Sequence, residues 1–316
     1  MAVKVDLDLL RVFENGLDLR RLERSAVPAR ILGYGEISTV LDIEASEDRG
    51  LAFKRLPMFE SEQEAETYST LYSVYESALR ERAGLHVAVS KTRWFTSDRG
   101  RVVLYIVQEK FDSAAIGHHV VRGATLDQAR FVVRAVLREA YKVFAFNREH
   151  RGNLEMGLDA QISNWAIDVV EGDEIQLVYL DTSTPLMRQN GQEQLNPDLF
   201  LRSAPSFLVW VIRRLFLPEV MTRYYDFRRV AMDLVANLYK EQRSDLVPPL
   251  VDVVNEFLCE QWTDEVEPLT VSEVRGYYRE DAIIWRFYLA ARKIDRRLYR
   301  MRGREYPYIL PERIKR

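Results

Sequence analysis

The sequence of 316 residues is poor in the features that mark secreted and membrane proteins. Its single cysteine, Cys259, excludes a disulfide within the chain and is typical of a reducing compartment. Residues 1–15 mix charged and apolar side chains and lack the long apolar stretch of a signal peptide. The most apolar later run, Phe207 to Leu217, is too short to cross a bilayer and contains two arginines. We therefore expect a cytoplasmic protein without a membrane partner.

Low net charge and missing motifs exclude further functions. A net charge of -3 gives no general attraction to nucleic acid, so we expect no nucleic-acid partner. The four histidines lack zinc-site spacing, because the adjacent pair His118-His119 would normally point in different directions. Neither a Gly-x-Ser-x-Gly elbow nor a Walker A sequence is present. These absences argue against a zinc enzyme, an α/β-hydrolase and a P-loop nucleotidase.

What the sequence does contain is a change of pattern near residue 107. Before it, a short amphipathic helix at 4–14 and a longer helix at 60–82 accompany predicted strands at 30–32, 38–43, 51–56, 87–95 and 101–107. We expect the third strand to end at Pro57. After residue 107 we expect a short hairpin over 165–180 and helices at 129–146, 205–216, 227–239, 250–262 and 281–300. The pattern predicts an α+β protein with a strand-rich first part and a helical second part.

Two glycines and a small polar residue lie between the first two predicted strands. Gly33, Gly35 and Ser38 form a hairpin in which the backbone can approach phosphate groups without an intervening Cβ. On the next strand, Lys54 follows Leu51-Ala52-Phe53, which is similar to the pattern Val-Ala-Ile-Lys. Taken alone, the hairpin also fits an ordinary turn, and the lysine fits a solvated edge residue.

An acidic residue near the start of the following helix is a candidate partner for Lys54. We prefer Glu64 to the neighbouring Glu62 and Glu66 because it shares a helix face with Tyr68 and Leu71. A carboxylate there could orient the lysine through a charge-assisted hydrogen bond. The alternative is a solvated acidic helix start, which the helix dipole favours.

The strongest chemical signal is Asp159, followed five residues later by Asn164, on a predicted loop before a short strand. The carboxylate can accept a hydroxyl proton, and the amide oxygen can bind magnesium. Asp181 ends the second strand of the following hairpin, where an unpaired acid is costly and a metal ion is a natural partner. The alternative for Asp181 is that it caps the turn at residues 182–185.

Taken in order, the elements from Gly33 to Asp181 resemble the protein-kinase-like superfamily, and within it the aminoglycoside phosphotransferase and choline kinase branch. The resemblance implies ATP and Mg²⁺ as cofactors and a hydroxyl of a small molecule as the phosphate acceptor. It also implies two lobes: a small antiparallel-sheet lobe at residues 1–107 that binds nucleotide, and a larger helical lobe at 108–316 that carries the catalytic loop and the acceptor site.

The same resemblance assigns roles to the candidate residues. Asp159 would be the catalytic base, and Asn164 and Asp181 the metal ligands. The nucleotide would be bound by Gly33, Gly35, Ser38, Lys54 with its partner Glu64, and the backbone of Glu109 at the adenine hinge. Acceptor specificity would lie in the helical half, with Tyr224, Tyr225, Asp226 and the neighbouring arginines as candidates.

The departures from the family pattern leave other functions open. Gly157-Leu158 replaces a His-Gly pair, Gln161 replaces a frequent histidine, and Thr182-Ser183 follows the metal aspartate. A catalytically silent nucleotide-binding pseudokinase that acts as a scaffold, or an enzyme that transfers AMP, remains an alternative. No activation segment is recognisable, because Leu217-Pro218-Glu219 follows a predicted helix, and this favours a small acceptor over a protein.

Overall fold

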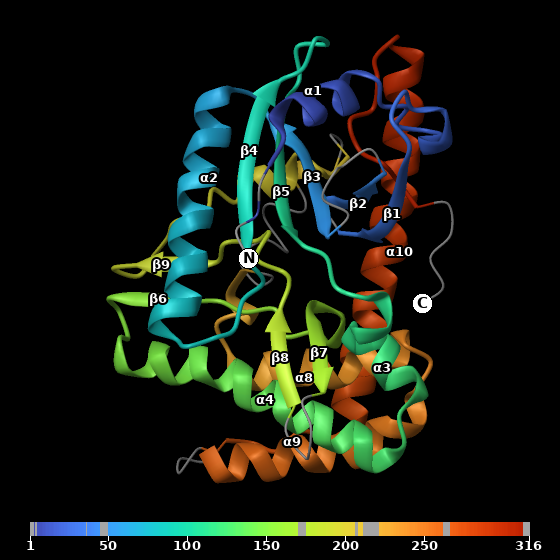
Figure 1. The fold of residues 1–316 in the computed structure, drawn as a ribbon. Helices are drawn as coiled ribbons and strands as arrows, with labels where there is room; N and C mark the ends of the chain where they lie inside the picture. The colour runs from blue at the N-terminus through green and yellow to red at the C-terminus, as the bar shows by residue number, and fades with distance from the viewer. Residues whose placement is uncertain are drawn as a thin grey trace.

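The chain folds into an α+β structure with a five-stranded antiparallel sheet (Figure 1). A computed structural model describes residues 3, 5–35, 37–44, 50–169, 175–205, 208–210, 221–261 and 266–311. The predicted helix at 205–216 and the Leu217-Pro218-Glu219 segment lie largely or wholly outside these residues. No helix of the described part is long and apolar enough to cross a membrane.

The sheet has the strand order β1-β2-β3-β5-β4. Its strands are β1 (Ala29–Tyr34), β2 (Thr39–Ile43), β3 (Leu51–Phe59), β4 (Ser90–Thr96) and β5 (Val102–Glu109). Side chains alternate between its two faces. In β5, Leu104 and Ile106 pack toward helix α2 (Glu62–Ser77), while Val103 and Val107 pack toward helix α1 (Leu7–Asn15). The sheet therefore lies between two helices, and each face has its own apolar core.

Strand β3 is longer than the sequence predicts. It runs through Pro57 to Phe59, although proline has no N–H to donate. The pairing of β3 with β5 shifts between Leu56 and Phe59, and this irregularity accommodates the proline. The expectation that Pro57 ends the strand is therefore wrong, because the strand continues past the proline through a local shift in register.

Helices dominate the chain after β5. They are α3 (Gly117–Gly123), α4 (Leu126–Glu149), α5 (Asp198–Leu201), α8 (Phe227–Lys240), α9 (Val247–Gln261) and α10 (Val271–Met301). The predicted capping box of α4 is confirmed: Thr125 Oγ1 accepts from the N–H of Gln128, whose side chain accepts from the N–H of Thr125. Helices α4, α8 and α9 share the largest apolar core. Two small sheets lie between this core and the large sheet (Figure 1). One is the pair β7 (Trp165–Val169) and β8 (Ile175–Tyr179), and the other has the three strands β6 (Leu154–Met156), β9 (Met187–Gln189) and β10 (Gln192–Glu193).

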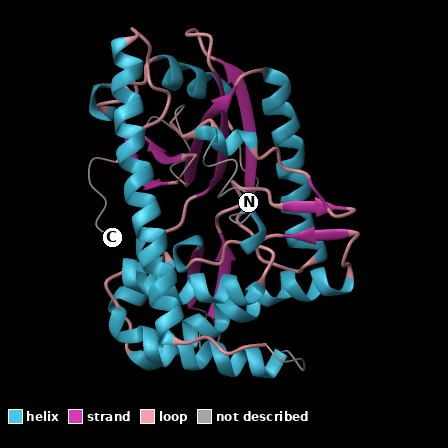
Figure 2. Cartoon of the chain, turned by 180° about the vertical axis from the view of Figure 1, so that it is seen from behind, coloured by secondary structure: helices cyan, strands magenta, loops and turns pink. Residues whose placement is uncertain are grey.

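Helix α10 connects the helical region to the sheet. It runs along the side of the molecule, and the chain after it returns to the sheet (Figure 2). Tyr306, Tyr308 and Leu310 join the apolar core on the α2 side, and Ile309 joins the core on the α1 side. Residues 306–310 therefore pack with the sheet, although they follow the helical region in sequence.

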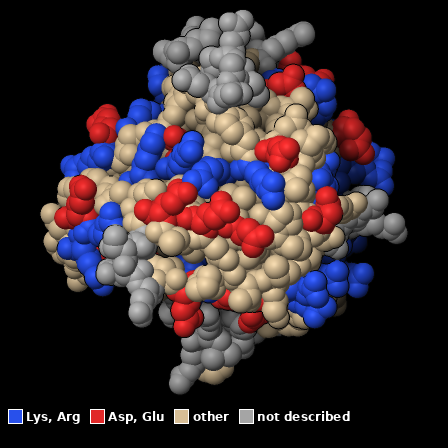
Figure 3. All heavy atoms as spheres, turned by 90° about the horizontal axis from the view of Figure 1, so that it is seen from below, with Lys and Arg blue, Asp and Glu red and all other residues tan. Residues whose placement is uncertain are grey.

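The outer face of the helical region carries mixed charge. Rows of basic and acidic side chains run side by side on this face (Figure 3). Arg134 of α4 pairs with Glu260 and Glu256 of α9, at 2.5 and 3.7 Å. Because neighbouring charges of opposite sign offset each other, this face offers no extended field of one sign.

Candidate active site

The structure brings Lys54 and Asp181 together, although 127 positions separate them in sequence. Lys54 lies on the α2-facing side of β3, and Asp181 follows the end of β8. The Lys54 Nζ donates to Asp181 Oδ1 at 3.0 Å and to the carbonyl of Leu180 at 2.9 Å. This ion pair joins the sheet to the short hairpin that carries the metal-ligand candidate.

Asp181 is held in its ionised form. Its Oδ1 also accepts from the hydroxyl of Ser183 at 2.6 Å and from the Ser183 N–H at 3.3 Å. Burial raises the pKa of the Asp181 carboxyl, but the charge of Lys54 and the bonds from Ser183 outweigh burial and hold that pKa below its ordinary value. Among the described residues the donors all meet Oδ1, so Oδ2 accepts no hydrogen bond from them.

The segment from Asp159 to Asn164 forms a closed loop. Asn164 Nδ2 and the hydroxyl of Tyr179 both donate to the Asp159 carbonyl at 3.1 Å. The N–H of Leu180 donates to the Asn164 carbonyl at 2.8 Å, so this loop is fastened to the residue that precedes Asp181. Because the amide nitrogen of Asn164 is committed to a carbonyl, its Oδ1 faces the other way and can act as a ligand.

Asp159 has the electrostatics of a base that works near neutral pH. Its Oδ1 accepts from the N–H of Gln161 at 3.1 Å. Burial, followed by the nearby charges of Asp233 and Asp181, raises the pKa of Asp159 to about 7. A carboxyl with this pKa can take up a proton during a reaction and release it again at neutral pH.

The glycine hairpin lies in the same row of the sheet as Lys54. Gly33 pairs with Val40 across β1 and β2, and Val40 pairs with Lys54 across β2 and β3. The Gly35 N–H donates to the Ser38 carbonyl at 3.0 Å, and a Cβ at Gly35 would come within 2.7 Å of Ser38 Oγ. At Gly33 a Cβ would meet nothing closer than 4.0 Å. A side chain at 35 would therefore force the Ser38 hydroxyl to move, whereas packing does not require glycine at 33.

Glu64 is not the partner of Lys54, so that expectation is corrected. The carboxylate of Glu64 forms a two-pronged pair with Arg202, at 2.6 and 2.8 Å, and this bonding lowers its pKa to about 2. The reason is its position: Ser61 caps α2, so Glu64 lies in the first helical turn. Its oxygen there also accepts from the N–H of Glu60 at 2.9 Å.

Tyrosines of α2 contact the segments next to Asp159 and Asp181. The hydroxyl of Tyr68 donates to the Ser183 carbonyl at 2.6 Å, and that of Tyr75 donates to the Gly157 carbonyl at 2.7 Å. Tyr72 shares a hydrogen bond of 2.7 Å with the Thr182 hydroxyl. The sequence carried a signal for these contacts, because buried tyrosines at helical spacing need polar partners for their hydroxyls.

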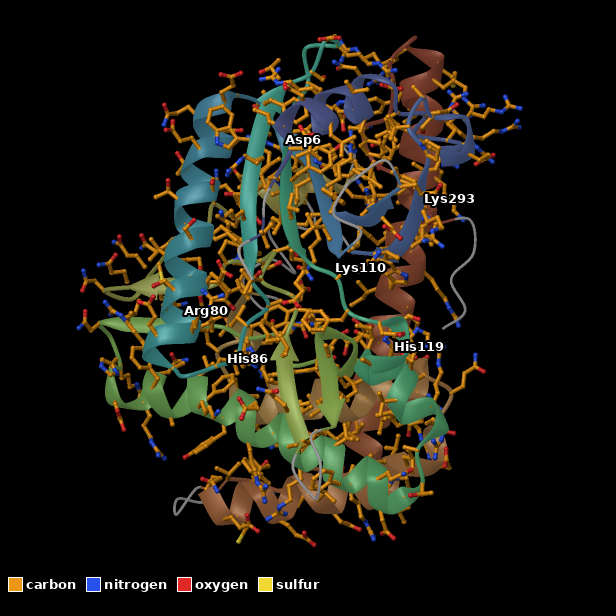
Figure 4. The ribbon with its side chains drawn as sticks, in the orientation of Figure 1. Asp6, Arg80, His86, Lys110, His119 and Lys293 are labelled. Carbon is orange, nitrogen blue, oxygen red and sulfur yellow. The ribbon has the colours of Figure 1, made fainter. Side chains whose placement is uncertain are left out.

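The backbone of Glu109 has less freedom than an adenine-binding hinge requires. Its N–H donates to the Val89 carbonyl at 3.1 Å, and the next N–H, of Lys110, donates to the Gly50 carbonyl at 2.7 Å. Lys110 marks the place where the chain leaves the sheet for the helical region (Figure 4). Of the backbone groups of Glu109 that we expect to face adenine, the N–H is already used by this intramolecular bond.

Asp159 also lines a tight recess in the helical region, which has no room for a water-sized molecule in this arrangement. Its polar side chains come from Asp159, Arg223, Tyr224, Arg229, Asp233 and Tyr277. Gln161 links two carboxylates, because its N–H donates to Asp159 and its Nε2 donates to Asp233 at 3.0 Å. Sequence reasoning missed Asp233 and Tyr277, which come to Asp159 only through the packing of α8 and α10.

The other acceptor candidates lie elsewhere. Asp226 is exposed and caps α8 by accepting from the Arg229 N–H at 3.2 Å. The hydroxyl of Tyr225 donates to Glu193 at 2.9 Å. Of the three candidates at 224–226, Tyr224 lines the recess.

The oxygens of Asn164 and Asp181 fit a magnesium site completed by nucleotide. Within the described residues no group of three or more His, Cys, Asp or Glu side chains could hold a metal ion. Magnesium in phosphoryl-transfer sites needs one or two protein oxygens, since phosphates and water supply the remaining ligands. The free oxygens of Asn164 and Asp181 meet that requirement.

Comparison with known proteins gives a family but no activity. No curated protein matches the sequence. The structure of WaaP in complex with acyl carrier protein is similar over 71% of this chain and 90% of that chain, with 16% identity and a TM-score of 0.33. A likeness at this TM-score is too weak to assign a fold or a reaction. A family model matches residues 20–296, so the chain belongs to DUF6206, a family of unknown function.

Proposed function

We propose that this protein is an ATP- and magnesium-dependent phosphotransferase that acts on a hydroxyl of a small-molecule acceptor. The observation that carries the proposal is the 3.0 Å contact between Lys54 and Asp181, with the loop of Asp159 and Asn164 bonded to the residue next to Asp181. Four groups that phosphoryl transfer needs thus converge from distant parts of the chain.

In this proposal each group has a distinct task. Lys54 binds phosphate oxygens of ATP, beneath the hairpin of Gly33, Gly35 and Ser38. Asn164 Oδ1 and Asp181 Oδ2 hold magnesium, which neutralises charge on the phosphates when bound. Arg202 anchors Glu64 at the start of α2, and this leaves Lys54 free to exchange Asp181 for phosphate.

Asp159 is the proposed base. Its carboxylate accepts the proton of the acceptor hydroxyl, whose oxygen forms a bond to the γ-phosphorus while the bond to the β,γ-bridging oxygen breaks. The products are ADP, the phosphorylated acceptor and a proton on Asp159. A pKa of about 7 suits this role, because the group is partly ionised at neutral pH.

We further propose the two-lobed arrangement of protein kinases for this fold, in a cytoplasmic protein. Residues 1–107 would bind nucleotide, and residues 108–316 would supply the catalytic loop and the acceptor site. The position of Lys54 on the sheet, and of Asp159 beside the helical core, supports this division. The return of residues 306–310 to the sheet adds a connection between the two parts.

One observation favours the silent alternative. Glu64 is paired with Arg202, and the α2 contacts to the Asp181 segment come from tyrosine hydroxyls. Tyrosine hydroxyls cannot orient Lys54 as a carboxylate would. A nucleotide-binding scaffold, or an enzyme that transfers AMP, would tolerate this arrangement.

Product analysis separates the three functions. The protein is incubated with ATP, magnesium and a broad pool of hydroxyl-bearing metabolites, and the products are identified by mass spectrometry. We expect ADP and a phosphorylated metabolite from wild-type protein, loss of both with Asp159→Asn, and no change with Asp127→Asn, an exposed aspartate at the start of α4. Pyrophosphate with an AMP adduct would replace the proposal by AMP transfer, and nucleotide binding without any product would favour the scaffold.

A further inference from the structure

Arg223 contacts neutral partners beside Asp159. Its Nη1 donates to the Tyr277 hydroxyl at 3.1 Å, and its Nη2 donates to the Tyr224 hydroxyl at 2.7 Å. The guanidinium carbon also lies 4.7 Å from the centre of the Tyr224 ring. The Nε–H is buried and has no acceptor among the described residues. One donor of this cation is therefore available inside the protein.

The charge of Arg223 lacks a direct counterion. Within the described residues no carboxylate lies in ion-pair distance of it, whereas the buried Arg55 meets Glu14 at 2.6 Å. Asp233 acts on Arg223 from farther away, and its carboxylate already accepts from Gln161 at 3.0 Å and from Tyr277. A partly buried guanidinium without a direct counterion contributes little to stability, so we expect this position to serve another purpose.

The recess beside Arg223 leads from this cation to the base. Arg223 and Asp159 both line it, and the exposed Arg229 lies at its edge. The space is too tight for a water molecule in this arrangement. An entering group therefore has to displace side chains that line the recess, and rotamer changes of this kind are common on binding.

We propose that the recess binds the acceptor and that Arg223 holds an anionic group of it, a carboxylate or a phosphate. This inference rests on the proposed phosphotransferase function, which places the acceptor hydroxyl at Asp159. Guanidinium groups bind carboxylate and phosphate oxygens through several parallel N–H donors, and Arg223 offers Nε–H together with the donors now held by tyrosine hydroxyls. The acceptor is thus a hydroxyl compound that carries an acid group.

Three matched probes test the proposal. Glycerol, glycerate and glycerol 3-phosphate share a hydroxyl-bearing carbon frame and differ in the charged group. In calorimetric titrations of wild-type protein we expect glycerate or glycerol 3-phosphate to bind at least about tenfold more tightly than glycerol, as a charge-assisted bond to a partly buried cation predicts. Which of the two anions binds more tightly distinguishes a carboxylate site from a phosphate site.

Variants assign the effect to Arg223. Arg223→Gln should bind both anions as weakly as glycerol, and Arg223→Lys should retain part of the preference because it keeps the charge. Arg130→Gln, at an exposed arginine of α4, should bind as wild type does. Thermal unfolding of every variant identifies loss of fold, and the Arg223 Nε–H resonance of wild-type protein, assigned by its absence from Arg223→Lys, should shift on addition of the bound anion.

Two results would overturn the proposal: wild-type protein that binds neither anion better than glycerol, or Arg223→Gln that binds the anions as wild type does. A purely structural Arg223 would lower the melting temperature of its variants and leave the wild-type Nε–H resonance unmoved by anions. Failure of the phosphotransferase proposal has a separate readout, because it appears as absence of ADP and of a phosphorylated product when wild-type protein is incubated with magnesium-ATP and the hydroxyl compounds.

Discussion

Two consecutive residues of β3, Lys54 and Arg55, form buried ion pairs on opposite faces of the sheet, and the two pairs differ in what surrounds them. Arg55 donates to both oxygens of Glu14 at 2.6 and 2.7 Å, and these side chains are 1% and 3% exposed. Lys54 meets one oxygen of Asp181, whose side chain is 33% exposed. Arg55 and Glu14 are enclosed by protein, and we call them the closed pair. Lys54 and Asp181 form the open pair, because the Asp181 side chain reaches solvent.

The hydrogen bonds around Glu14 and Asp181 differ in the same way. Glu14 also accepts from the Tyr105 hydroxyl, and Arg55 donates to the Pro307 carbonyl, so this pair connects α1, two strands and the C-terminal segment. Its hydrogen-bonding capacity is used within the protein. Among the described residues no donor meets the second oxygen of Asp181, and its side chain reaches solvent. The closed pair therefore fits a structural role, and the open pair fits the ligand-binding role that we propose for it.

Breaking the closed pair should have the largest effect on stability. Glu14→Gln leaves the Arg55 charge buried without compensation, so we expect the free energy of unfolding to fall by about 3–5 kcal/mol. Urea denaturation measures this change. Glu305→Gln, which weakens an exposed pair with Arg99, is the control and should cost less than about 1 kcal/mol. Equal effects of the two substitutions would contradict the distinction between closed and open pairs.

The closed pair should also shape stability at acid pH. Burial raises the pKa of Glu14, but Arg55 and Tyr105 outweigh burial and hold that pKa below the ordinary glutamate value of 4.5. The stabilisation is therefore complete above pH 4.5 and is lost as the pH falls through the lower folded value. The unfolding free energy of Glu14→Gln should fall less steeply below pH 4.5 than that of wild type; parallel curves would exclude Glu14 as the titrating group.

Breaking the open pair should instead remove activity. Lys54→Met should lower kcat by about 10²–10³-fold, the usual loss when a group that stabilises transition-state charge is removed. Its unfolding free energy should change less than that of Glu14→Gln, because water reaches Asp181. Lys142→Met, at a lysine paired with Glu139 on α4, serves as the control for kinetics. Full activity of Lys54→Met would remove Lys54 from the proposed site.

The pH profile probes the base beside the open pair. Since the pKa of Asp159 is about 7 and the base must be ionised, kcat/KM should fall as the pH is lowered through about 7. Asp233→Asn removes a like charge, so this acid limb should move to lower pH. Asp245→Asn, at an exposed aspartate paired with Arg243, should leave the limb in place. An unmoved limb in Asp233→Asn would exclude Asp233 as a cause of the raised pKa.

We expect the smallest change in unfolding free energy from the loss of a single hydrogen bond between α2 and the segment that leads to Asp159. Tyr75→Phe removes the donor to the Gly157 carbonyl and should cost about 1–2 kcal/mol of unfolding free energy. Tyr239→Phe, whose half-buried ring stacks on Tyr278, is a matched control and should cost less. Denaturation of both variants under the same conditions gives the difference, and equal costs would exclude a special role for the Tyr75 hydroxyl.

Local patterns in the sequence predicted most helices and strands. They did not predict which side chains far apart in the sequence become partners. Periodic apolar residues located α2, α4, α8 and α9, and the turn at Gly35 located the first hairpin. The pairing of Glu64 with Arg202, 138 positions away, depends on how the chain returns to α2, which no local pattern records. Asp233 and Arg223 reach Asp159 for the same reason, through the packing of distant helices.

Calorimetric titration with magnesium-ATP tests the central claim that the open pair is a nucleotide site. We predict saturable binding by wild-type protein that requires magnesium, strong weakening in Asp181→Asn, and binding close to wild type in Asp245→Asn. Glu14→Gln should bind as wild type does under conditions where it is folded. Absence of binding by wild-type protein, or equal binding by Asp181→Asn and wild type, would contradict the account.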